Sequence, residues 1–184
     1  MLNLLNTFRE KVRLFQDIPL LGLRLLLVFV FIGPATMKLG HIDGTAMWFD
    51  SLGIPFPYLN AYLSAVTESA GFVLLFFGLG TRIISIPLII TLLVAFFTVH
   101  IDNGWSVIGQ SSVPEIAERL NMGREILQEY GNYDWLTEKG KFVILQNGAE
   151  NVVTYMVMLL TLIVYGPGRL SFDYLIEMKF GKKD

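Results

Sequence analysis

The chain has 184 residues, of which 53% are hydrophobic and 16% charged, and its formal net charge is −2 at neutral pH. Soluble domains carry about 25% charged residues, so this composition indicates a membrane protein. The lack of a basic surface argues against nucleic acid as a partner. The lack of cysteine excludes disulfides, thiolate metal sites and CxxC redox chemistry within the chain.

The first element predicted in chain order is an amphipathic helix near the N-terminus. Leu4, Phe8, Val12 and Phe15 recur at helical spacing, with charged residues between them. This pattern is typical of a helix lying in the membrane interface.

Four apolar blocks follow, at residues 18–37, 58–79, 83–100 and 149–165. Each is about as long as a helix must be to cross ~30 Å of hydrocarbon. Helix is the expected structure, because a lone strand would leave its backbone groups unpaired in lipid. We interpret the first block as a retained helix rather than a cleaved signal peptide, since three more blocks follow it. The fold class predicted is an all-α integral membrane protein, a four-transmembrane-helix bundle in one domain over 1–184.

The connection at residues 101–148 is expected to fold into a small helical extracytoplasmic cap. Ser112 and Glu115 fit a capping box, with Pro114 in the first turn. The residues after Ser112 then place one apolar face on that helix: Val113, Ile116, Ala117 and Leu120.

The distribution of Lys and Arg predicts the orientation. The two tails and the short link between the second and third spans are basic, whereas the cap is net acidic. We therefore expect a multi-pass protein of the bacterial inner membrane, with both termini cytoplasmic. The basic residues are Arg9, Lys11, Arg13, Arg82, Arg169, Lys179, Lys182 and Lys183.

Two charged residues lie deep inside the predicted spans. Glu68 is ten residues beyond Tyr58, which places it about 15 Å deep, and Arg24 is about 21 Å below Lys38. A charge at the bilayer centre costs a few kcal/mol, so Glu68 is expected to face the bundle interior. Arg24 is the partner that we favour for Glu68. The alternative is that Arg24 extends to the inner surface and Glu68 is protonated within the packing.

A polar rim is predicted at the outer ends of the spans. Lys38 and Asp102 are interpreted as ordinary interfacial residues, whereas His100 and Glu150 are favoured as functional. Such a rim is suited to a quinone ring. Two histidines without cysteines are a weak metal signal, so no metal site is predicted. The rim residues are Lys38, His41, His100, Asp102, Glu150 and Asn151, with Arg24 and Glu68 below them.

The segment GPGRLSFD, residues 166–173, is predicted to form a corner after the fourth span. Gly166 and Pro167 end that span. Ser171 caps the next helix, Asp173 lies in its first turn, and Arg169 lies at the level of the lipid phosphates.

Taken with the motifs above, the chain resembles the DoxX family of small four-helix membrane proteins. The resemblance is carried by Arg24 and the following GPATMKL, by ESAGFVLLFFGLGTR, by AFFTVHIDNGW, and by NGAENVVTYMVMLL leading to GPGRLSFD. Because these segments cover all four spans, the resemblance is global. HIDNGW and the enlarged outer loop resemble the DoxX-type proteins found beside biosynthetic genes for copper-binding peptides.

The buried charges, the acidic cap and the resemblance together suggest two functions of different classes. The family takes its name from a small subunit of an archaeal quinone-linked sulfur oxidoreductase, and other members resemble accessory subunits of membrane redox complexes. The first hypothesis is therefore a redox subunit that holds a quinone at Arg24, Glu68, His100 and Glu150. The second is a non-enzymatic anchor or partner, acting through the cap in the maturation of a copper-binding peptide or in stress protection. Transport is a third possibility, for which four spans would need a homodimer.

Overall fold

A computed structural model describes residues 15–180, which are largely helical. Within this range there is no β-strand, only one antiparallel bridge between Ile108 and Leu145. The chain divides into two compact units, each considered by itself. The first unit comprises residues 15–94 and 154–180, and the second comprises residues 95–153. The all-helical class is confirmed over the described range, whereas most of the predicted N-terminal amphipathic helix lies outside it.

Three helical stretches are long and apolar enough to cross a membrane: α2 (Asp17–Gly40), α4 (Pro57–Phe77) and the stretch Thr81–Asn103. They agree within a few residues with the first three predicted spans. The length and apolar composition of these blocks were a sufficient signal for the three stretches.

The third stretch changes its helical form along its length. It starts as α5 (Thr81–Ala95), continues as a π-helical turn (Phe96–His100) and ends in a 3₁₀ turn (Ile101–Asn103). The helix at the fourth predicted span, α8 (Glu150–Tyr165), has 16 residues. At 1.5 Å per residue it is about 24 Å long, shorter than the ~30 Å hydrocarbon core.

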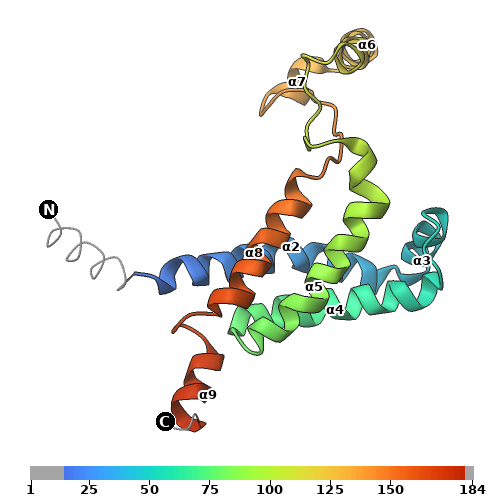
Figure 1. Ribbon diagram of the computed structural model, residues 1–184. Helices are drawn as coiled ribbons and strands as arrows, with labels where there is room; N and C mark the ends of the chain where they lie inside the picture. Colours follow the sequence, from blue (N-terminus) through green and yellow to red (C-terminus); the bar gives the residue numbers. More distant parts are fainter. Residues whose placement is uncertain (1–14, 181–184) are drawn as a thin grey trace, which may run out of the picture. The chain divides into compact units, whose positions relative to one another are not determined.

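In the first unit α2 and α4 lie side by side and run in opposite directions (Figure 1). The face that α4 buries is composed mostly of small residues, which lets two helix backbones approach closely in a membrane. Gly71 extends this close packing to α5, because a Cβ at Gly71 would lie 2.7 Å from the Leu88 side chain. The buried residues of α4 are Ala61, Ser64, Ala65, Glu68, Gly71 and Leu75, and those of α2 are Arg24, Leu27, Val28, Phe31, Ala35 and Lys38.

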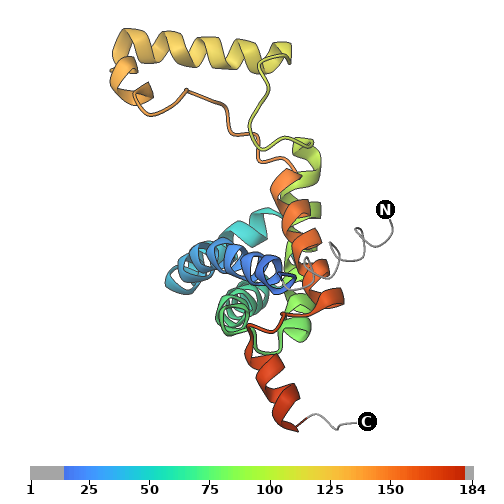
Figure 2. The same cartoon turned by 90° about the vertical axis from the view of Figure 1, so that its left-hand side faces the viewer.

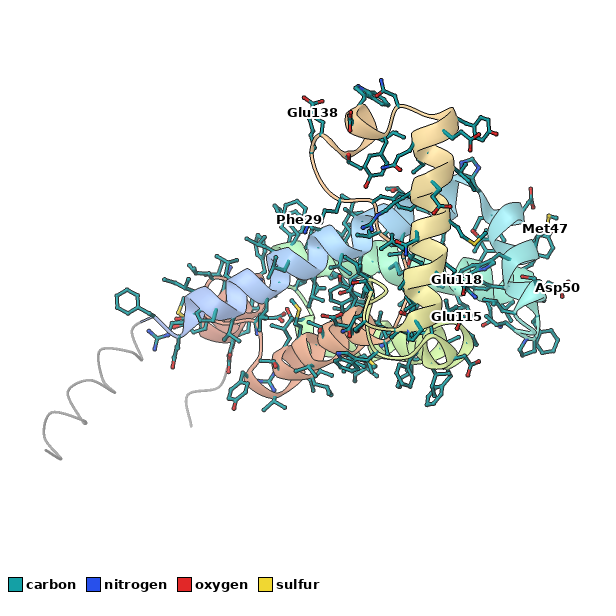
Figure 3. The ribbon with its side chains drawn as sticks, turned by 90° about the horizontal axis from the view of Figure 1, so that it is seen from above. Phe29, Met47, Asp50, Glu115, Glu118 and Glu138 are labelled. Atoms are coloured by element: carbon teal, nitrogen blue, oxygen red, sulfur yellow. The ribbon has the colours of Figure 1, made fainter. Side chains whose placement is uncertain are left out.

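A short helix, α3 (Ile42–Ser51), connects α2 to α4. Its Ala46 and Phe49 pack with Ala61 of α4. Met47 and Asp50 point away from this contact, as does Phe29 on the outer face of α2 (Figure 3). Phe29 is 76% exposed, which is the expected state for a helix face that contacts lipid rather than water.

The second unit is built on two chain segments that pair through their backbones. Gly109 N–H donates to Ile144 O at 2.8 Å, and Gln146 N–H donates to Val107 O at 2.8 Å. Beyond this pairing the chain forms α6 (Pro114–Tyr130) and α7 (Tyr133–Thr137), seen as the long and the short helix of this unit in Figure 2. The prediction that residues 101–148 contain helices is therefore confirmed.

The predicted capping box at the start of α6 is wrong. Val113, not Ser112, is the N-cap residue, and no side chain caps the helix there. Pro114 occupies the first turn and disfavours a helical conformation at the residue before it, which holds Val113 extended with ψ 120°. The boundary therefore lies one residue later than the Ser-x-x-Glu spacing indicates.

Candidate functional site

The first unit contains a buried ion pair between its two packed helices. Lys38 Nζ donates a hydrogen bond to Glu68 Oε1. Lys38 is only 8% exposed and Glu68 4%, so both charges are removed from solvent. The other carboxylate oxygen, Oε2, has no partner among the described residues. A ligand that donates a hydrogen bond would satisfy it.

The prediction that Arg24 pairs with Glu68 is wrong, as is the interpretation of Lys38 as an ordinary surface residue. Arg24 lies beside Gly78, where a Cβ would overlap its guanidinium group. Ten positions separate Gly78 from Glu68, or about 15 Å along α4. Depths counted from the outer end of each span do not contain the offset of α2 and α4 along each other, and this offset decides which side chains meet.

Side-chain direction gives the physical reason for this change of partner. Side chains of a helix lean toward its N-terminus. Lys38 lies near the C-terminal end of α2, so its ammonium group reaches back toward the level of Glu68. Arg24 leans in the same direction, toward the start of α2, which takes its guanidinium away from Glu68 and toward the end of α4. The sequence contains the positions of Lys38, Arg24 and Glu68. These positions indicate the correct ion pair only when the antiparallel register of α2 and α4 is also known.

Arg24 is 1% exposed and fixes the end of α4 against the C-terminal segment. Its Nη2 donates to the carbonyl oxygen of Leu170, while Nε and Nη1 have no partner among the described residues. Gly78 ends α4 with φ +64°, and its lack of a Cβ leaves room for the close approach of the guanidinium.

The predicted corner at residues 166–173 forms, and it connects helix ends. Gly166 has φ +78° and donates its N–H to Leu162 O at 2.9 Å. Ser171 caps α9 (Phe172–Phe180), because its Oγ accepts from Tyr174 N–H at 3.2 Å.

Charged side chains hold this corner to the other helices of the first unit. Asp173 accepts hydrogen bonds from the N–H groups of Gly80 at 2.7 Å and Thr81 at 3.0 Å, at the start of α5. Arg169 forms an ion pair with Asp17, in which Arg169 Nε lies 3.9 Å from Asp17 Oδ2. These long-range contacts were not predicted, because no local sequence pattern pairs residues more than ninety positions apart.

The predicted rim residues lie in both units. Lys38 and His41 belong to the first, where His41 O accepts from Thr45 Oγ1 at 3.0 Å. His100 and Glu150 belong to the second, and each contacts backbone. His100 Nδ1 is 2.7 Å from Asn147 O, and Glu150 Oε2 accepts from Val107 N–H at 3.3 Å. Asn151 is exposed. Convergence of all these residues on one rim stays a prediction.

Three apolar helical stretches of membrane length define an all-helical, multi-pass membrane protein, and comparison with known proteins shows what the chain is similar to. Residues 19–101 match the DoxX family model. A curated protein of Bacillus subtilis (strain 168), "Putative oxidoreductase CatD", is 36% identical over 85 residues, covering 46% of this chain and 62% of that relative. No solved structure matches the chain.

The predicted DoxX resemblance is thus confirmed over residues 19–101. This region contains Arg24, Lys38 and Glu68, together with α2 to α5 and His100. The rest of the proposed resemblance, over the fourth span and the corner, stays a prediction.

Proposed function

We propose that the protein is a quinone-binding subunit of a membrane oxidoreductase pathway, with the Lys38–Glu68 pair as its polar site. The observation that carries the proposal is the unpartnered Oε2 of Glu68, buried beside an ammonium group. A buried charge without its full set of partners destabilises a protein by several kcal/mol. Packing alone is therefore a poor explanation for a buried Lys–Glu pair at this position.

The chemistry of the pair is suited to a quinone headgroup. The Lys38 ammonium can donate to a quinone carbonyl, and Glu68 can accept from a quinol hydroxyl. The quinone supplies two-electron, two-proton chemistry, and Glu68 and Lys38 would hold and exchange the protons. The electrons would come from a partner oxidoreductase, because the chain has no cysteine for redox chemistry of its own. The name of the Bacillus relative, "Putative oxidoreductase CatD", supports this class of function.

The proposal includes a four-helix bundle in which α8 is the fourth span. After Glu150 and Asn151 in its first turn its residues are mostly apolar, and the carbonyls of Ile163 and Val164 near its end accept hydrogen bonds from Arg82 at the start of α5. In the proposed bundle the start of α5 and the end of α8 would therefore lie together on one side of the membrane.

The experiment is quinone extraction from the full chain purified in mild detergent. We expect wild-type protein to retain quinone in near-stoichiometric amount. The double variant Lys38→Met/Glu68→Leu should lose most of it, because its apolar side chains keep the packing and remove the polar site. The matched control is Glu115→Leu/Arg119→Met, which removes an exposed ion pair on α6.

Two results would overturn the proposal: wild-type protein without quinone, or a Lys38/Glu68 variant that retains as much as the control. Circular dichroism of each variant shows whether the helices are kept, so loss of quinone can be told from loss of fold.

A further inference from the structure

An open pocket of about 760 Å³ lies in the first unit, where α2 begins and α8 ends. Its apolar lining includes Leu20, Leu23 and Ile83, and two arginines, Arg82 and Arg169, also line it. We propose that this pocket binds the phosphodiester headgroup of an anionic phospholipid, with an acyl chain along the apolar lining. This site lies apart from the Lys38–Glu68 pair and does not depend on quinone binding.

Arg82 has unused donors at this pocket. Its Nη1 donates to Ile163 O at 2.6 Å and to Val164 O at 3.1 Å. No residue of the described range accepts from its Nη2 or Nε. A Cβ at Gly166 would lie 3.0 Å from Nη2, so the guanidinium lies against another pocket-lining residue. These donors are the groups that a phosphate oxygen would use.

The guanidinium group of Arg169 also has donors available for a ligand. Its Nε is 3.9 Å from Asp17 Oδ2, and its side chain is 65% exposed. An exposed ion pair at this distance contributes little, so the guanidinium can turn to a phosphate without a large loss. Arginine forms bidentate hydrogen bonds with phosphate, which favours that exchange.

The acidic residues of the pocket differ in how they would affect an anion. Asp173 uses both oxygens on the N–H groups of Gly80 and Thr81, and Asp17 Oδ1 accepts from Arg169 N–H at 2.8 Å. Glu177 is exposed and has no such contact. It is therefore the carboxylate expected to oppose an anionic headgroup.

The apolar lining identifies a lipid rather than free phosphate as the ligand. Leu20 and Leu23 come from α2, and Ile83 comes from α5, both of which are candidate membrane spans. Basic pockets between transmembrane helices are a recognised setting for anionic lipid headgroups. Inorganic phosphate would gain nothing from this lining.

The experiment is native mass spectrometry of the full chain with phosphatidylglycerol or phosphatidylcholine of identical acyl chains. We expect wild-type protein to retain phosphatidylglycerol preferentially. Arg169→Gln should lower that retention about fivefold, as expected for one basic residue near an anionic lipid. Glu177→Gln should raise it. The matched control is Arg119→Gln, which removes an arginine of equal exposure, also paired with a carboxylate.

Several outcomes would overturn the proposal. They are equal retention of the two lipids by wild-type protein, an equal effect of Arg169→Gln and Arg119→Gln, and loss of phosphatidylglycerol on adding millimolar inorganic phosphate. Quinone content measured on the same samples should stay at the wild-type level in Arg169→Gln, which separates this site from the Lys38–Glu68 site.

Discussion

At the scale of single residues, the strongest constraint is that α2 and α4 bury charge. Lys38 and Glu68 contact each other, whereas Arg24, fourteen positions earlier on α2, lies against Gly78 at the end of α4 and donates to the carbonyl oxygen of Leu170. The three residues therefore fix the register of two apolar helices at two separate levels. Apolar contacts alone would tolerate a slip along the helix axis.

Breaking the ion pair should be costly, and removing both charges should not. Glu68→Leu leaves a buried ammonium group, so we expect it to lower the free energy of unfolding by about 3–5 kcal/mol. Adding Lys38→Met to Glu68→Leu should restore most of this loss. The measurement is thermal unfolding in detergent, monitored by circular dichroism. Additive losses in the double variant would show that the two side chains do not form one unit.

Gly78 and Gly80 form a matched pair for a second test. Both have positive φ, +64° and +58°, but only Gly78 has the Arg24 guanidinium where a Cβ would lie. Gly80→Ala should cost about 1–2 kcal/mol, from backbone strain alone. Gly78→Ala should cost clearly more, because Arg24 must also move. Equal thermal stabilities of the two variants would argue that Arg24 does not pack against this turn.

The sequence was sufficient to identify two of the three buried charged residues in the described range, but not the third, nor which of them meet. Glu68 and Arg24 were recognisable because charges are rare in apolar spans. Lys38 was misread because two residues from the end of a helix is an ordinary place for a lysine. Its burial depends on how α2 and α4 are offset, which the sequence of neither helix contains.

At the scale of elements, helix positions were predictable and some helix ends were not. The spans follow from apolar blocks of membrane length, and the corner at Gly166 and Ser171 follows from local rules. The start of α6 differs from its sequence signature because Pro114 restricts Val113. The contacts of Asp173 with α5 were not predictable, because they join segments far apart in the chain.

The start of α6 allows a third test. Val113 is the N-cap and has no side chain to cap the helix, so Val113→Asn should stabilise α6 by about 1 kcal/mol. Ser112→Ala should have no effect, although it would be harmful if a capping box were present. Amide hydrogen exchange of the first turn of α6 measures both. Faster exchange in Ser112→Ala would restore the capping box as the correct description.

At the scale of the whole molecule, the number of membrane crossings decides the topology. If α2, α4 and α5 cross and α8 does not, then α6 and α9 lie on the same side. If α8 also crosses, they lie on opposite sides. The basic residues on and before α9 and the acidic residues on α6 favour the second arrangement, by the preference for positive charge on the cytoplasmic side. Glu115 and Glu118 of α6 are both exposed (Figure 3).

This topology can be measured directly because the native chain has no cysteine. We expect Glu118→Cys on α6 to react with a membrane-impermeant maleimide when the outer surface of the inner membrane is accessible. Met178 on α9 is 63% exposed, so a cysteine at this position is accessible to the reagent. We expect Met178→Cys to react only after the membrane is opened. Reaction of both before opening would mean that α8, at about 24 Å, does not cross, since that length is below the ~30 Å of a bilayer core. Such a result would leave three spans and remove the four-helix bundle on which the proposed arrangement of α5 and α8 depends.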